Sequence, residues 1–172
     1  SRLIYGEDIF PTALQKVYIL TNLCETYCYF QPEKVIEIAR EALPLSNAFK
    51  DLKSKGKIYY SLAIAWLHKK KFKRAKKYIR KSLYLNHIDG YVAGKLYAYM
   101  AQAYLEYAQK KQLDPKTIRF IKSIQMKIEV YTCFNLPIAL MMEDYSQFSE
   151  IKASQEWLDF YQTAVNYRHF LE

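Results

Sequence analysis

Glycine and proline are scarce in this chain of 172 residues, which contains 4 glycines and 5 prolines. An all-β protein needs many tight turns, and these two residue types form most of them. Their scarcity argues against an all-β fold and favours long helices joined by short connections. Hydrophobic residues make up 51% of the chain and charged residues 25%, which is typical of a folded domain rather than a disordered one.

Long apolar runs are also absent. No stretch of 18 or more apolar residues occurs, so the sequence predicts no transmembrane helix and no membrane insertion. No basic segment followed by an apolar one opens the chain, as a secretory signal would. The cysteines Cys24, Cys28 and Cys133 do not form a disulfide framework, and the expected location is the reducing cytoplasm. We interpret residues 1–172 as one domain, which leaves a longer parent protein open.

Recognisable catalytic patterns are missing too. The three histidines are scattered, and no Ser/His/Asp order, glycine-rich phosphate loop or HExxH motif occurs. Cys24 and Cys28 lie one helical turn apart, as two ligands of one metal ion can. However, Cys24 falls on an expected packing position, and no second ligand pair with suitable spacing follows. The sequence therefore predicts no enzyme, no metal site and no cofactor.

Acidic residues are missing from one segment only. Residues 52–88 contain 12 Lys and Arg and no Asp or Glu, whereas the rest of the chain has 14 basic and 17 acidic residues. The net charge of +9 is therefore a local feature. Such a cluster either binds phosphates or acidic partners, or forms the solvated face of a helix. The solvated face is the interpretation that we prefer from the sequence.

Helical periodicity is the strongest positive signal, and two adjacent segments show it. The apolar face of 58–68 and that of 72–83 are each spaced as one side of a helix, and a short basic turn at 68–71 joins them. The positions on the two faces are Tyr59, Leu62, Ala63 and Trp66, and then Phe72, Ala75, Ile79, Ser82 and Leu83. Small residues on both faces let the two helices approach closely. The pattern predicts a helical hairpin.

This hairpin resembles a tetratricopeptide repeat, a unit of about 34 residues. The order of large, small and aromatic positions fits that repeat at every spacing. Two departures occur, because Lys70 stands where the repeat usually has glycine and His87 where it ends in proline. Similar patterns precede and follow it, and their first helices contain Leu23, Cys24 and Tyr27, and Tyr97, Met100, Ala101 and Tyr104.

Two prolines mark where the second helices of these flanking repeats should begin. Pro32 follows the first repeat's leading helix closely, as expected of a proline in the first helical turn. In the third repeat the second helix starts late, after Asp114 and Pro115. This delay indicates either a long first helix or a lengthened turn.

The resemblance implies an all-α fold, a tetratricopeptide-like stack of helical hairpins that forms a right-handed α-solenoid. The repeats are expected at about 16–47, 56–89 and 92–130. Residues 1–15 are expected to form a short leading helix. Residues 137–171 are expected to form capping helices, with a single long helix as the alternative.

In such stacks the first helices line a concave groove and the second helices form the outer wall. The resemblance therefore implies a peptide-binding groove lined by Asn22, Glu25, Tyr60, Ile64, His68, Tyr99 and Gln102. Amides beside aromatic rings suit an extended peptide, although Ile64 and Tyr99 instead pack against capping helices in an alternative interpretation. The basic residues that avoid the second helix's packing positions are expected on the convex surface, and they are Lys73, Arg74, Lys76, Lys77, Arg80 and Lys81.

Three functions follow as hypotheses. The first is an interaction module that binds a peptide or protein segment in the groove, with a homodimer left open. The second is the sensing domain of a bacterial transcription regulator, because irregular repeats rich in Tyr, Lys and Ile look like those of the Rgg, PlcR and Rap peptide receptors of Gram-positive bacteria. The third is binding of nucleic acid or an anionic surface by 53–81, which burial of the stacking aromatics disfavours.

Overall fold

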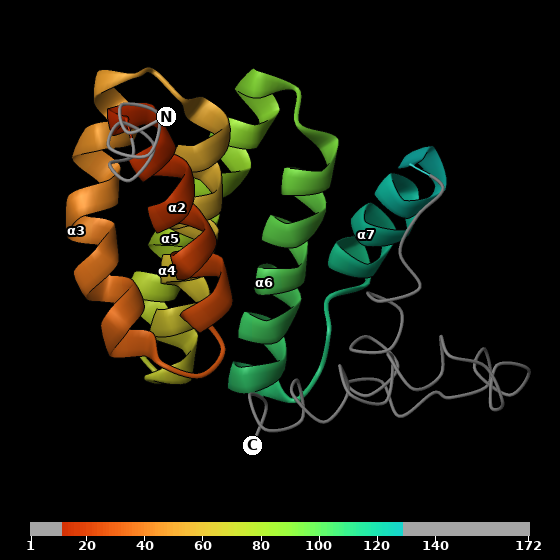
Figure 1. The fold of residues 1–172 in the computed structure, drawn as a ribbon. Coiled ribbons are helices and arrows are strands. Elements are labelled where there is room, and N and C mark those ends of the chain that lie inside the picture. The colour runs from red at the N-terminus through yellow and green to blue at the C-terminus, as the bar shows by residue number, and fades with distance from the viewer. Residues whose placement is uncertain (1–11, 129–172) are drawn as a thin grey trace, which may run out of the picture.

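A computed structural model of the chain describes the backbone of residues 12–128 and the side chains of residues 12–124. Every regular element in this part is an α-helix, which confirms the predicted fold class (Figure 1). The helices are α2 (Ala13–Tyr27), α3 (Pro32–Ala48), α4 (Leu52–His68), α5 (Phe72–Asp89), α6 (Val92–Lys110) and α7 (Pro115–Ile128). The predicted capping helices at 137–171, and Cys133, lie outside the described residues.

The helices pair as three hairpins, α2 with α3, α4 with α5, and α6 with α7. Each first helix also packs beside the first helix of the next hairpin, and α3 and α5 each pack on the hairpin that follows them. In Figure 1, α2 lies in front of α4 and α5, with α3 on one side and α6 and then α7 on the other. The result is a stack of helical hairpins with α4 at its centre.

The helix starts have local causes. Thr12 and Gln15 form a reciprocal capping box at the start of α2, so residues 13–15 belong to α2 and not to a separate leading helix. Pro32 is the first residue of α3, as the sequence predicts. Asp51 caps α4 by accepting hydrogen bonds from Ser54 N at 3.0 Å and Ser54 Oγ at 2.7 Å.

The predicted packing positions of the central hairpin lie in the core. Leu62, Ala63, Ala75, Ile79 and Ser82 are each at most 4% exposed. The larger aromatic positions on the same two faces are partly buried against this core. The flanking hairpins follow the same rule, with buried Cys24, Ala39 and Ala42 in the first and buried Met100, Ala101, Tyr104, Ile121 and Ile124 in the third.

The third hairpin has both of the irregularities that its sequence allows. Helix α6 is 19 residues long, and residues 111–114 separate it from α7. Glu106 ties this turn together, because its carboxylate accepts hydrogen bonds from Gln102 Nε2 at 3.1 Å, Asp114 N at 2.9 Å and Thr117 Oγ1 at 2.6 Å. The turn therefore depends on one acidic side chain from the last third of α6.

Candidate functional site

A cavity of about 330 Å³ lies between the first helices and the C-terminal half of α5. Three kinds of side chain line it: tyrosines at its rim, one acid and one lysine, and small or amide residues on its buried wall. The tyrosines are Tyr29, Tyr60, Tyr91 and Tyr97, and the charged pair is Glu25 and Lys57. The small and amide residues are Gly56, Gly94, Ser82 and Asn86.

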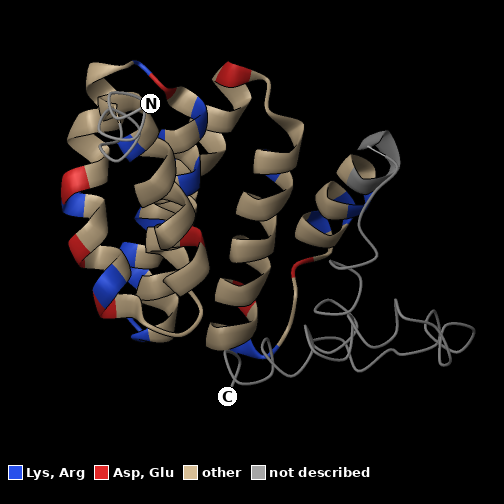
Figure 2. Ribbon diagram, in the orientation of Figure 1, with Lys and Arg blue, Asp and Glu red and all other residues tan. Residues whose placement is uncertain are grey.

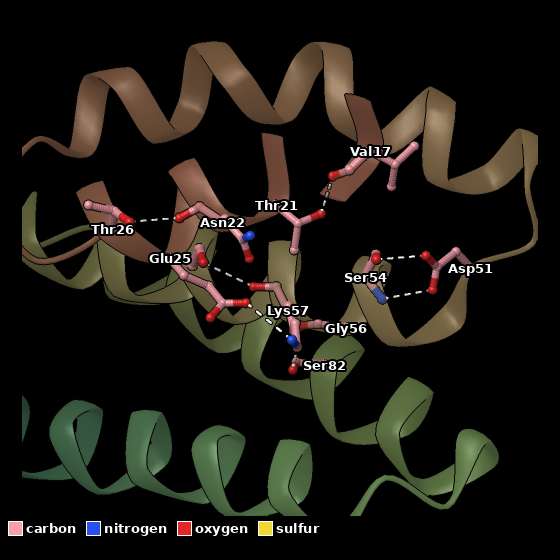
Figure 3. Close-up of polar contacts among 11 residues, drawn as sticks. Val17, Thr21, Asn22, Glu25, Thr26, Asp51, Ser54, Gly56, Lys57 and Ser82 are labelled. Atoms are coloured by element: carbon pink, nitrogen blue, oxygen red, sulfur yellow. Dashed lines mark hydrogen bonds and ion pairs between the residues drawn. The ribbon is translucent and has the colours of Figure 1, made fainter. Parts of the chain in front are cut away.

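The buried wall is built around Asn86 of α5, whose side chain is 2% exposed. Its Nδ2 donates to Ser82 O at 2.8 Å and lies 3.2 Å from Ser82 Oγ. Ser82 Oγ in turn donates to Gly56 O of α4 at 2.9 Å (Figure 3). Asn86 Oδ1, which belongs to the same cavity wall, accepts no hydrogen bond. One half of this amide is therefore hydrogen-bonded within α5, and the other half is enclosed without a donor.

Two glycines make room for this amide. A Cβ atom on Gly94 of α6 would lie 2.1 Å from Asn86 Oδ1, and one on Gly56 of α4 would lie 3.0 Å from it. Both glycines are helical, so their role here is close approach and not an unusual backbone angle. Asn86 therefore fills the space between α4 and α6 that two missing side chains leave.

Glu25 of α2 and Lys57 of α4 form an ion pair across the cavity, with 3.7 Å between Lys57 Nζ and Glu25 Oε1 (Figure 3). This separation is too long for a hydrogen bond, and the buried Oε1 atom accepts none. The pKa of Glu25 is raised, mainly because burial removes water from the carboxylate, while Lys57 acts in the opposite direction. The pair places one carboxylate and one ammonium group on the lining of the cavity.

The tyrosines form an aromatic rim. The hydroxyls of Tyr29 and Tyr60 are hydrogen-bonded to each other, and the rings of Tyr60 and Tyr97 meet edge to face at 5.4 Å between centroids. Lys53 Nζ lies 4.2 Å from the centre of the Tyr91 ring, which holds that ring beside the start of α4. Tyr97 is 39% exposed and Tyr60 only 6%, so Tyr97 presents the more accessible ring of this pair.

A second hollow of about 310 Å³ continues the cavity along α2 and the start of α4. Asn22 and Tyr18 line it from α2, Ser54 lines it from α4, and Lys57 borders both hollows. We call the cavity and this hollow together the trough. It follows the first helices of the stack, the side on which the sequence predicts a groove.

The structure brings three of the seven predicted groove residues together in the trough, namely Asn22, Glu25 and Tyr60. Ile64 does not line a groove, because it is 0% exposed. The reason is that α4 is packed against α2, α3, α5 and α6, which leaves little of its surface open. The expectation that Ile64 contacts a ligand is therefore wrong.

The other three predicted groove residues lie elsewhere. Tyr99 stacks on Phe120 of α7 with 5.1 Å between ring centres, so it packs within its own hairpin. Gln102 donates to Glu106 and borders a separate hollow at the α6–α7 turn. His68 is the last residue of α4 and is exposed, at the opposite end of that helix from Lys57.

Asn86 and its two glycine neighbours are the residues of the candidate site that the repeat pattern does not predict. A signal for Asn86 exists in the sequence, because it follows Ser82 by four residues and Ile79 by seven. An amide on the buried face of a helix needs partners. Similarly, Gly56 and Gly94 both fall near the starts of first helices, where a helix former would be more stable.

All six predicted convex residues are exposed on α5, which agrees with a solvated face; they are Lys73, Arg74, Lys76, Lys77, Arg80 and Lys81. Two of them cover aromatic rings, since Arg74 lies 4.5 Å from the centre of Trp66 and Lys81 lies 5.1 Å from that of Tyr59. Figure 2 shows that α6, by contrast, is largely uncharged along its length.

The described cysteines are buried. Burial raises the pKa of the Cys24 thiol to about 12 and also raises the pKa of Cys28, so both stay protonated at neutral pH. Within residues 12–124, no three His, Cys, Asp or Glu side chains are grouped as metal ligands. None of the six described helices combines the length and apolar character needed to span a bilayer.

Comparison with known proteins gives no match, because no family model, no curated protein and no solved structure matches this chain. Function therefore has to be argued from the site itself.

Proposed function

We propose that this chain is a tetratricopeptide-like interaction module that binds a peptide or a segment of another protein in the trough along α2, α4 and α6. The observation that carries the proposal is the composition of the cavity wall. Tyrosine rings surround a buried acceptor on Asn86 and a charged pair, Glu25 and Lys57. A few directed polar groups inside an apolar rim are what ligand sites in proteins have in common.

A peptide segment suits this wall better than a small apolar ligand does. Peptide groups supply both N–H donors and C=O acceptors, and the lining holds a partly exposed carboxylate on Glu25 and a partly exposed ammonium group on Lys57. The trough extends beyond the cavity to Asn22 and Ser54, so more than one residue of a bound segment finds polar partners. The exposed ring of Tyr97, which is 39% exposed, stands at the rim to cover a side chain.

Binding of nucleic acid or another polyanion by the basic surface of α5 is the second candidate. The exposure of all six predicted cations favours it. Against it, Trp66 and Tyr59 are partly buried and lie beneath basic side chains, so these rings do not offer open faces for stacking on bases. The binding that this surface supports is electrostatic, and it should weaken by orders of magnitude between about 50 and 200 mM salt.

The test of the trough begins with panning a library of short random peptides on the immobilised chain. Binding of the recovered peptides is then measured by fluorescence anisotropy. Lys57→Met and Tyr97→Ala should each weaken binding by about tenfold, which corresponds to about 1.4 kcal/mol. The matched control is Glu37→Met, since Glu37 is an exposed acid on α3 outside the trough; it should bind as the parent does.

Reversing the charge of Lys76, Lys77 and Arg80 to Glu separates the two candidates. For a trough ligand this triple variant should alter mainly the association rate and its salt dependence. If instead the triple variant abolishes binding while Lys57→Met and Tyr97→Ala do not, the basic surface is the binding site and the proposal is wrong.

A further inference from the structure

We propose that the outer face of α5 binds the surface of an anionic lipid bilayer. This inference goes beyond the proposed function and does not rest on it. Successive residues of a helix are turned by about 100°, so the outer face is defined as the side chains within about 60° of Lys77. All of them are exposed, and they are Lys73, Arg74, Lys77, Arg80, Lys81, Tyr84 and Ile88.

The charge on the outer face is of one sign and is not compensated. Asp89 is the single acidic residue of α5, and it falls about 120° from Lys77, outside the face. The ion pairs among the described residues all involve lysines of other elements, so no cation of the outer face is paired with an acid there. Clusters of about four to eight Lys and Arg on an amphipathic helix are typical of proteins that bind anionic lipids.

Two large side chains with apolar surface lie in the middle of this cationic face. Tyr84 is 66% exposed and Ile88 is 52% exposed, and each falls within about 20° of Lys77. A tyrosine ring, which is apolar with a polar tip, suits the headgroup level of a bilayer. An aliphatic side chain gains free energy when it leaves water for the acyl boundary. An anionic bilayer therefore satisfies the cations and these two side chains together.

Nucleic acid satisfies the outer face less completely. Its phosphates attract the cations, and the ring of Tyr84 has a face on which a base can stack. Stacking does not use the aliphatic side chain of Ile88, which stays in water beside the phosphates. The combination of clustered cations with an exposed isoleucine therefore favours a bilayer over nucleic acid.

The trough lies on the opposite side of the same helix. Ser82 and Asn86, which line the cavity, fall at least about 140° from Lys77. A bilayer against the outer face therefore leaves the trough open. A trough ligand and a membrane surface can be bound at the same time.

The test is sedimentation of the whole chain with lipid vesicles. We expect binding to phosphatidylcholine vesicles that contain about 30% phosphatidylserine, and none to phosphatidylcholine alone. Changing Lys73, Lys77 and Arg80 together to Glu should weaken binding at least about 100-fold, because each cation near an anionic surface contributes about fivefold.

The matched control for charge reverses three exposed cations of α3 and the turn after it, so that the net charge changes equally. It is Lys34→Glu with Arg40→Glu and Lys50→Glu. We expect this control to bind within about threefold of the parent, since salt screens charges that do not contact the surface.

The apolar contact is tested without a change of charge. Tyr84→Ser combined with Ile88→Ser should weaken vesicle binding about tenfold. Ile19→Ser is the control, because Ile19 is a 48% exposed side chain on α2, and it should bind as the parent does. In addition, Ile88→Trp should give an emission that shifts to the blue with anionic vesicles, relative to the parent spectrum, whereas Ile19→Trp should not. Circular dichroism checks that each variant keeps its helices.

Three results would overturn the inference. The first is a parent chain that does not bind anionic vesicles. The second is an equal loss in both charge-reversal variants, which would make net charge, and not the outer face, the cause. The third is full binding by the Tyr84→Ser, Ile88→Ser variant together with tight binding of duplex DNA by the parent, which would assign the surface to nucleic acid. Lys57→Met and Tyr97→Ala should bind vesicles as the parent does, so these results are separate from those for the trough.

Discussion

At the scale of single residues, Asn86 of α5 connects the packing of α4, α5 and α6. Its Nδ2 is committed to Ser82, and its Oδ1 fits between α4 and α6 only because Gly94 and Gly56 have no Cβ atom in that space. A polar side chain at such a position is normally replaced by an apolar one unless it has a partner. Within the described residues the Oδ1 acceptor has no donor, so this buried amide is only half satisfied.

Gly94→Ala tests this arrangement through stability. Alanine in a helix is usually more stable than glycine by about 0.5–1 kcal/mol. Here a Cβ atom would lie 2.1 Å from Asn86 Oδ1, so we expect a loss of about 1–3 kcal/mol from overpacking, measured by urea denaturation. Asn86→Ala in the same chain should restore part of the loss. A Gly94→Ala chain as stable as the parent would show that the amide does not occupy this space.

Glu25 gives a second prediction, on pH. Its folded-state pKa lies above the ordinary carboxyl value of 4.5, mainly through burial. An acid with a raised folded-state pKa disfavours the fold when it is ionised, and this penalty is relieved as the pH falls through that pKa. The melting temperature of the parent relative to Glu25→Gln should therefore be lowest at neutral pH and rise toward pH 4. A difference that instead grows in the parent's favour with pH would mean that the ion pair with Lys57 outweighs burial.

At the scale of elements, three helices are followed by a lysine in a backbone conformation that is unusual for lysine. Lys50, Lys70 and Lys111 have positive φ angles of 51°, 57° and 55°, the left-handed region that glycine usually occupies after a helix, as Gly90 does here with φ 70°. The closing hydrogen bonds are nevertheless present, for example from Lys71 N to Trp66 O at 2.9 Å. Lysine in place of glycine at position 70 therefore makes the turn less stable but does not change its geometry.

Lys70→Gly should consequently stabilise the protein. Relief of the left-handed strain is worth about 1–2 kcal/mol, reduced by about 0.4–1 kcal/mol for the greater flexibility of glycine in the unfolded chain. We expect a gain of about 0.5–1 kcal/mol in the free energy of unfolding. Gly90→Ala is the matched control, because it places a side chain in the same backbone region, and it should destabilise by a similar amount. A neutral or unfavourable Lys70→Gly would contradict the assigned turn.

The α6–α7 turn depends on Glu106, which accepts three hydrogen bonds from across it. Glu106→Ala removes the shared acceptor, and the partly buried Thr117 hydroxyl loses its partner. We expect a loss of about 1–2 kcal/mol, with faster hydrogen exchange of amides in α7 than in α4. Gln109→Ala, at an exposed position on the same helix, is the control. Equal exchange in α7 would show that packing of Ile121 alone holds the helix.

At the scale of the whole molecule, sequence periodicity predicts the hairpins well because burial follows the spacing of apolar residues. Leu62, Ala63 and Ala75 are core residues as expected. The start of α7 is also predictable, since Asp114 and Pro115 mark it. Pro44 shows where local signals mislead, because α3 continues through it. The Pro44 side chain is exposed. Packing of the rest of α3 outweighs the one backbone hydrogen bond that proline cannot donate.

The site is less predictable from sequence than the fold is. Asn22, Glu25 and Tyr60 lie on the side of the stack that the repeat predicts, where they line the trough, because that side follows from the helix order. Ile64 is not, because the exposure of a central helix depends on how many neighbours surround it, which the spacing within one helix does not contain. The sequence does not predict Asn86 for a similar reason, since the space for its side chain comes from glycines in two other helices.

The measurement that tests the central claim most directly is an amide NMR titration of the ¹⁵N-labelled chain with a peptide recovered by panning. The trough account predicts the largest chemical-shift changes at Glu25, Lys57, Asn86 and Tyr97, with little change at the exposed cations of α5 such as Lys76. Changes concentrated on residues 73–81, with the trough amides unmoved, would contradict the claim that the first helices form the binding surface.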